Sequence, residues 1–178
     1  AVAGGNIVPV LVEGLRKLEY RGYDSAGIAL LNPRLERLRS VGRVAELAIQ
    51  AEGRSARLGI AHTRWATHGV PSERNAHPHV SGDLALVHNG IIENYAEIKQ
   101  ELLVAGYAFT SDTDTEVIAH LVQETLKSSV DLLDAVCRTT RRLVGAYAIA
   151  VLREGTDRIV VARQGAPLLL GLGEDGNY

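Results

Sequence analysis

The stretch A-Y-A-I-A-V-L at residues 146–152 is followed by R-I-V-V-A-R at 158–163 and P-L-L-L-G at 167–171. Each of these apolar runs is typical of a β-strand. The loops between them are much shorter than the dozen or so residues that a helical crossover needs. We therefore expect antiparallel pairing of adjacent strands here, which argues against a doubly wound parallel sheet.

Upstream of these strands, helical and strand-like patterns alternate. Two capping boxes, Asn94 with Glu97 and Thr113 with Glu116, are expected to begin two of the helices. The loop at 66–81 is expected to be irregular. Helices are expected over 7–18, 44–52, 96–105, 116–126 and 131–143, and further strands over 28–31, 35–41, 57–63 and 83–88. The pattern predicts one α/β domain over residues 1–178, with both ends cut.

The composition limits the classes of function. Nineteen basic and twenty-one acidic residues give a net charge of -2, so the chain shows no electrostatic footprint for nucleic acid. No apolar run approaches the ~18 residues that suggest a membrane span. The single cysteine, Cys137, cannot form an internal disulfide, which fits a reducing compartment. Because Cys137 shares helical spacing with Leu133 and Val144, we expect an inert core thiol.

The stretch I-A-H-T-R-W-A-T-H-G at residues 60–69 gathers polar side chains at the end of a predicted strand. The guanidinium of Arg64 could hold a carboxylate with two parallel hydrogen bonds. The alternative is a surface arginine paired with a glutamate. Thr67 and His68 add donors on the same turn, which favours an anion site.

Asn89-Gly90 and Asp114 each allow two interpretations. Asn-Gly is a strong hairpin-turn signal, but an Asn amide and a Gly N–H can also form an oxyanion hole. Asp114 lies in the first turn of a predicted helix, where an acid complements the helix dipole. It could instead face a ligand ammonium, and Arg64 with Asp114 would then hold both ends of a free amino acid.

Five histidines within 27 residues raise the question of a metal site: His62, His68, His77, His79 and His88. No H-x-x-x-H on a helix and no Cys/His pair at zinc spacing accompanies them. We therefore expect neither a metal nor another cofactor, although a histidine-dependent metallohydrolase stays as a competing hypothesis.

Five segments in order resemble one family, the N-terminal glutaminase domains of glutamine–fructose-6-phosphate aminotransferases, within the class II glutamine amidotransferases. They are E-G-L-R-K-L-E-Y-R-G-Y-D-S-A-G (13–27), A-H-T-R-W-A-T-H-G (61–69), N-A-H-P-H (75–79), H-N-G-I-I-E-N (88–94) and S-D-T-D-T-E-V-I-A-H-L (111–121). The resemblance implies the four-layer αββα sandwich of N-terminal nucleophile hydrolases, with two mainly antiparallel sheets.

The resemblance also implies the chemistry. The nucleophile would be an N-terminal cysteine a short strand-turn upstream of Ala1, so the chain as given is expected to be inactive. Asn89 and Gly90 would form the oxyanion hole, and Asp114 would hold the α-amine of L-glutamine. The remaining roles are substrate contacts: Arg64, Thr67 and His68 at the α-carboxylate, Trp65 lining or gating the pocket, Arg21 near the N-terminus, and His77 nearby without a defined role.

The resemblance further implies partners: L-glutamine, a C-terminal sugar-phosphate isomerase domain of the same protein, and a homo-oligomeric, cytoplasmic full-length enzyme. No nucleic acid or membrane is expected. The product would be ammonia for transfer to fructose 6-phosphate, giving glucosamine 6-phosphate. Two alternatives remain, a non-catalytic amino-acid-binding module and an amidotransferase domain that serves another acceptor.

Overall fold

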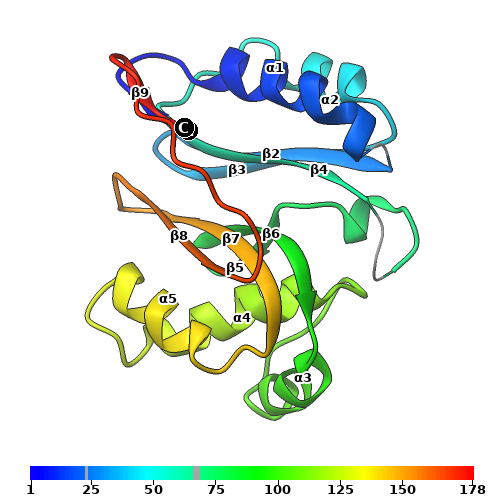
Figure 1. Cartoon of the computed structure of the whole chain (residues 1–178), viewed down its shortest axis with the longest axis vertical. Coiled ribbons are helices and arrows are strands. Elements are labelled where there is room, and N and C mark those ends of the chain that lie inside the picture. The colour runs from blue at the N-terminus through cyan, green and yellow to red at the C-terminus, as the bar shows by residue number, and fades with distance from the viewer. Residues whose placement is uncertain (23, 66–68) are drawn as a thin grey trace.

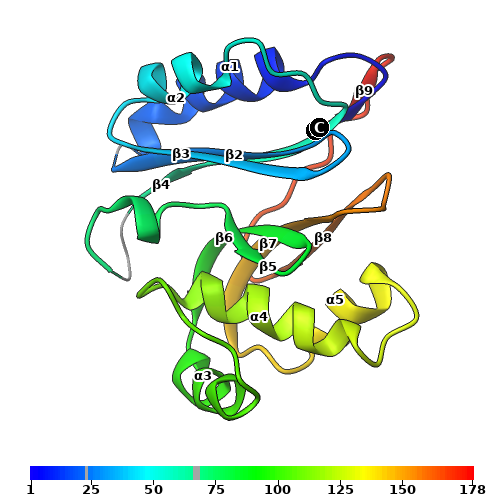
Figure 2. The same ribbon diagram turned by 180° about the vertical axis from the view of Figure 1, so that it is seen from behind.

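The computed structural model describes residues 1–22, 24–65 and 69–178. Its elements form four layers, α/β/β/α, in which two sheets face each other and helices cover both outer sides (Figure 1). The view from behind shows the same layers (Figure 2). The expected sandwich of two antiparallel sheets is therefore confirmed.

The first sheet has the strand order β3-β2-β4-β1-β9, and all of its neighbouring strands pair antiparallel. Helices α1 and α2 cover its outer face (Figure 1). They bury Leu15, Leu47 and neighbouring apolar side chains against Ile28 of β2. The elements are β1 (Val2–Ala3), α1 (Val8–Leu18), η1 (Glu19–Arg21), β2 (Ser25–Leu31), β3 (Leu35–Val41), α2 (Val44–Ala51), β4 (Leu58–Arg64) and β9 (Gly176–Asn177).

The second sheet has the order β5-β6-β7-β8, again antiparallel throughout. The largest core cluster lies between this sheet and its helices, where Ile118 and Leu121 pack with Leu86 and Tyr147. The elements are η2 (Glu73–Asn75), β5 (His79–Ser81), β6 (Leu84–Ile92), α3 (Tyr95–Val104), α4 (Asp114–Leu126), α5 (Leu132–Thr140), β7 (Gly145–Arg153) and β8 (Ile159–Gln164). Among the described residues, no helix is long and apolar enough to cross a membrane.

The segment that contains N-A-H-P-H enters the space between the sheets. A Cβ placed on Gly27 of β2 would lie only 2.1 Å from the carbonyl oxygen of His77. Glycine therefore lets this segment approach β2 closely. As a result His77, expected to lie in an irregular loop, is buried between the two sheets.

The hairpin-turn interpretation of Asn89-Gly90 is wrong. Strand β6 runs straight through both residues, with Asn89 opposite Ala148 and Gly90 opposite Tyr147 of β7. Gly90 has a φ of +129°, and a Cβ there would lie 2.0 Å from the carbonyl oxygen of Ala146. The glycine serves a close approach of two strands inside the sheet rather than a turn at its end.

Three other expectations are corrected. P-L-L-L-G at 167–171 pairs into neither sheet, and Leu169 is 92% exposed. Cys137 is exposed, because the buried face of α5 carries Leu132, Ala135, Val136 and Thr139 instead. The side chain of Asn94 does not cap α3 but bonds the backbone of Arg142 and Val144. By contrast, Thr113 does cap α4, by accepting from the N–H of Glu116.

Candidate active site

A cavity of about 430 Å³ collects most of the predicted site residues. It lies where the C-terminal end of β4 meets the middle of β6. Its lining residues are Leu18, Arg21, His62, Thr63, Arg64, Trp65, His77, His88, Asn89, Gly90 and Pro167. Six predicted residues therefore meet here, from both sheets and from segments up to seventy positions apart. Thr67 and His68 lie outside the described residues.

Arg64, the last residue of β4, is only 3% exposed. Its Nη1 lies 3.6 Å from Oδ1 of Asp24, and its Nη2 donates to the carbonyl oxygen of Gly69 at 2.9 Å. The alternative of a surface arginine paired with a glutamate is therefore wrong. Asp24 was missed in the sequence, where its only signal is its place directly before β2, whose Ser25 pairs with Arg64.

Asn89 is held by a residue of the opposite sheet. Nε2 of His62, on β4, lies 2.8 Å from the Oδ1 of Asn89, on β6. In the sequence, the histidine spacing raised His62 only as a candidate metal ligand. The sequence around each residue does not indicate this contact, because it forms only when the two sheets pack together.

Asp114 does not line the cavity but lies behind His88, which does. It begins α4 and is 3% exposed, and its Oδ2 accepts from the N–H of Ile92 at 2.9 Å. Its Oδ1 is 3.9 Å from Nδ1 of His88, which lines the cavity. The carboxylate thus lies on the same side of the molecule as Arg64 but is not itself part of the lining.

Comparison with known proteins decides the family. The family model described as a glutamine amidotransferase domain matches residues 62–176. The chain belongs to this glutamine amidotransferase family. The match begins at His62, so it includes every described residue of the cavity wall except Leu18 and Arg21.

Curated relatives of this amidotransferase domain are named glutamine–fructose-6-phosphate aminotransferase (isomerizing). The protein of Pseudomonas putida is 56% identical over 184 residues, and that of Vibrio cholerae is 54% identical over 183 residues. Both alignments cover 100% of this chain but only 30% of the relative, so the chain spans less than a third of their length.

A solved structure shares the fold over nearly the whole amidotransferase domain. The glutamine phosphoribosylpyrophosphate amidotransferase of B. subtilis superposes with a TM-score of 0.85 at 29% identity. The match covers 99% of this chain and 39% of that one. The two-sheet architecture described above is thus that of a known amidotransferase.

Histidines gather at the inner side of the cavity in this amidotransferase domain, where His62, His77 and His88 line the wall and His79 lies behind them. The rings of His62 and His77 stack with centroids 4.2 Å apart, and His79 meets His77 edge-on at 5.0 Å. Thr115 Oγ1 lies 2.9 Å from Nε2 of His77 and 3.1 Å from Nδ1 of His88. In the described part of the chain, no group of three or more His, Cys, Asp or Glu side chains could hold a metal ion.

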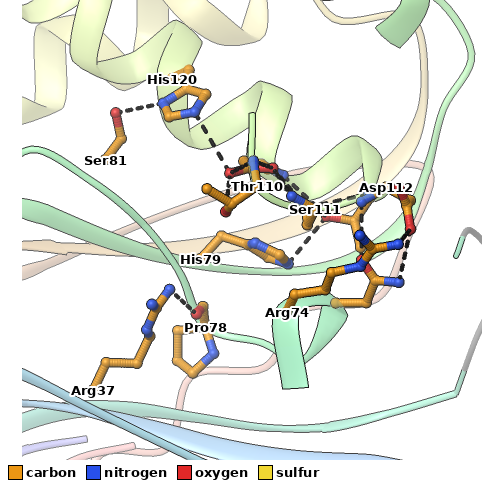
Figure 3. Close-up of polar contacts among 12 residues, drawn as sticks. Arg37, Arg74, Pro78, His79, Ser81, Thr110, Ser111, Asp112 and His120 are labelled. Carbon is orange, nitrogen blue, oxygen red and sulfur yellow. Dashed lines mark hydrogen bonds and ion pairs between the residues drawn. The ribbon is translucent and has the colours of Figure 1, made fainter. Parts of the chain in front are cut away.

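A polar network behind the histidines fixes the start of α4 (Figure 3). His79 Nε2 lies 3.1 Å from Thr113 Oγ1, and Ser111 donates to the carboxylate of Glu116 from both its N–H and its Oγ. Burial opposes ionisation of Glu116. Hydrogen bonds from His120, Thr110 and Ser111 outweigh that effect and hold the pKa of Glu116 below its ordinary value.

On the outer side of the network, two arginines tie the N-A-H-P-H segment to its neighbours. Arg74 pairs with Asp112 at 2.7 Å, and Arg37 donates to the carbonyl oxygen of Pro78 (Figure 3). Asn75 adds a second link, because its Oδ1 accepts from the N–H of Asp112 at 2.9 Å. These contacts connect the segment that carries His77 to the loop that leads to Asp114.

The histidine cluster predicts a loss of stability in mild acid. Burial lowers the pKa of His79 to about 3, and it also lowers the pKa values of His62 and His77. Below pH ~6.5 these histidines bind protons in the unfolded chain but not in the folded chain, so their contribution to stability is full above that pH and falls below it. Each such histidine removes about 1.4 kcal/mol per pH unit of the free energy of unfolding.

Urea unfolding of the chain at pH 7.5, 6.5 and 5.5 would measure this loss. Staying above pH 5 separates it from the contribution of Glu116, which is lost only further into acid. The amino group of Ala1, whose pKa burial lowers to about 6, also reduces stability in this pH range, so the difference between the unaltered chain and His79→Gln gives the share of His79. We expect the urea midpoint to fall at each step. His79→Gln should make the slope shallower, and an unchanged midpoint from pH 7.5 to 5.5 would contradict the prediction.

Proposed function

We propose that the chain is the glutaminase part of a longer aminotransferase and hydrolyses L-glutamine to glutamate and ammonia. One observation carries the proposal. A buried guanidinium from one sheet and an Asn-Gly pair from the other line the same cavity. The cavity volume is within the range of small-molecule sites. Such a cavity offers a cation for a carboxylate and amide donors for a developing oxyanion.

In this proposal, the α-carboxylate of glutamine binds the guanidinium of Arg64, with Thr67 and His68 as further donors. A guanidinium has five N–H donors, so it can hold Asp24, the Gly69 carbonyl and a substrate carboxylate together. Asp114 holds the α-amine. Because His88 lies between this carboxylate and the cavity, the substrate ammonium must approach Asp114 beside the His88 ring. Trp65, 62% exposed, lines the mouth of the cavity. Arg21 and His77 complete its wall.

The direction of β1 supports an N-terminal nucleophile. Val2 pairs with Leu58, and the amino group of Ala1 bonds the carbonyl oxygen of Gly59 at 2.7 Å. Any residues that precede Ala1 in the whole protein would continue along β4 towards Arg64. A residue roughly five positions upstream would face Arg64 if the antiparallel register continued. We propose that a cysteine at the processed start of the natural protein supplies the thiol there.

The chemistry then follows from the groups around the cavity. The α-amine of that cysteine, with an ordinary pKa of ~7.7–8.0, takes the thiol proton. The sulfur attacks the carbonyl carbon of the glutamine side chain, and the resulting oxyanion accepts from the Asn89 amide and the Gly90 N–H. The proton passes to the leaving nitrogen, which departs as ammonia. Water cleaves the thioester that remains, giving glutamate and the free thiol.

For the whole protein we propose transfer of this ammonia to fructose 6-phosphate, giving glucosamine 6-phosphate. The support is the 56% identity to relatives that carry that name, against 29% to the phosphoribosylpyrophosphate amidotransferase. A C-terminal sugar-phosphate isomerase domain, a homo-oligomeric state and a cytoplasmic location belong to the same proposal. An amidotransferase with another acceptor is the alternative.

The test is glutamine hydrolysis by the full-length protein beginning at the processed cysteine. We expect release of glutamate from glutamine without any acceptor, and formation of glucosamine 6-phosphate when fructose 6-phosphate is added. A glutamine-mimicking electrophile should label each chain once. A folded protein that binds glutamate in calorimetry but neither hydrolyses glutamine nor takes the label would instead be a binding module. Hydrolysis without glucosamine 6-phosphate would point to another acceptor.

A further inference from the structure

We infer that His62 is a positioning residue that orients the Asn89 side chain so that its amide N–H groups face the reacting carbonyl. This inference rests on the proposed glutaminase function. It starts from the 2.8 Å contact between Nε2 of His62 and Oδ1 of Asn89, which joins β4 of one sheet to β6 of the other.

The surroundings of the two ring nitrogens fix where the proton of His62 lies. An N–H on Nδ1 of His62 would be buried without an acceptor among the described residues, whereas an N–H on Nε2 lies 2.8 Å from Oδ1 of Asn89, a carboxamide oxygen that can accept it. Nδ1 of His62 is buried and makes no hydrogen bond within the described residues, as expected of a ring nitrogen without a proton. The Nε2–H form of a neutral imidazole satisfies both conditions.

The proton on Nε2 in turn decides which way the amide of Asn89 points. With Oδ1 held by His62, the Nδ2 group lies on the opposite branch of the planar amide, away from His62. If the amide were reversed, two N–H donors would face each other and Oδ1 would turn to the place of the oxyanion. The partial negative charge of Oδ1 would then repel the oxyanion. A single hydrogen bond therefore separates a working oxyanion hole from a repulsive one.

The surroundings keep His62 in this state. Its ring stacks on His77, with an angle of 26° between the planes, which limits rotation. Burial, together with the charge of Arg64, lowers the pKa of His62 and so favours the neutral ring. His77 is itself bound to Thr115 of α4, so the orientation is supported from the helix layer.

The matched test pair is His62→Gln and His62→Asn in the full-length protein. A glutamine amide can place an N–H near the position of Nε2, whereas the shorter asparagine cannot reach it. We expect His62→Gln to keep kcat for glutamine hydrolysis within about threefold. His62→Asn should lower kcat by about 10–100-fold, less than the full loss of an oxyanion-hole donor, and leave KM nearly unchanged. His120→Gln, which removes a buried histidine bound to Ser81 outside the cavity, should leave kcat unchanged.

A second measurement separates an effect on the orientation of the Asn89 amide from a general effect on the packing of the site. The γ-aldehyde of glutamate forms a thiohemiacetal whose oxyanion occupies the oxyanion hole, whereas glutamate itself does not. His62→Asn should weaken aldehyde binding by the same factor as kcat and leave glutamate binding unchanged. Equal loss for both ligands, or equal kcat in the Gln and Asn variants, would overturn the inference. If the unaltered protein failed to hydrolyse glutamine, the proposed function would fall instead.

Discussion

Replacing Asn89 with alanine is expected to lower kcat for glutamine hydrolysis by about 10²–10³-fold, with little change in KM. This corresponds to about 2.7–4 kcal/mol of lost transition-state stabilisation. The amide contacts the oxygen only when negative charge develops on it, so the loss falls on the transition state and not on the bound substrate. Steady-state kinetics of the full-length protein measures both constants.

Asn94→Ala is the matched control. Asn94 is the second asparagine of the segment H-N-G-I-I-E-N (88–94). Its side chain makes hydrogen bonds with the backbone of Arg142 and Val144, outside the cavity. This variant should lose some stability and keep kcat. If Asn89→Ala instead raised KM and kept kcat, Asn89 would be a ground-state substrate contact and no part of an oxyanion hole.

Replacing Arg64 with methionine is expected to have two separate effects. KM for glutamine should rise about 10²–10³-fold, because a buried partner of the substrate carboxylate is lost. The free energy of unfolding should fall by about 3–5 kcal/mol, because the carboxylate of Asp24 stays buried without its cation. Kinetics and urea unfolding measure these effects independently.

A double variant separates the two roles of Arg64. Adding Asp24→Asn to Arg64→Met removes the uncompensated charge, so most of the lost stability should return while KM stays high. Recovery of both stability and KM would show that Arg64 supports the fold alone and does not bind substrate. Arg16→Met, at an exposed ion pair with Glu13, is a control that should change neither quantity measurably.

Much of the fold could be predicted from local pattern. The short loop between β7 and β8 requires antiparallel neighbours, and the helical spacing of α1, α4 and α5 places each helix within a few residues of its observed bounds. P-L-L-L-G was misread because an apolar run predicts burial only if a partner strand lies beside it. Cys137 was misread because spacing alone did not reveal which stripe of α5 faces the sheet.

The site divides in the same way. Arg64 and the Asn89-Gly90 pair carry their chemistry in residue type and position, so the sequence could nominate them. Asp24 and His62 act through partners on other strands, and their roles become visible only when β2, β4 and β6 are packed. Asp114 stays a proposal for the substrate ammonium, because His88 stands between its carboxylate and the cavity.

Trp65, at the mouth of the cavity, is the one tryptophan among the 178 residues. Excitation near 295 nm therefore selects a single indole beside the proposed substrate site. A shift in its emission on adding glutamate would report occupancy directly in an optical titration, without an engineered dye. Arg64→Met, which leaves the indole in place, would serve as the silent reference.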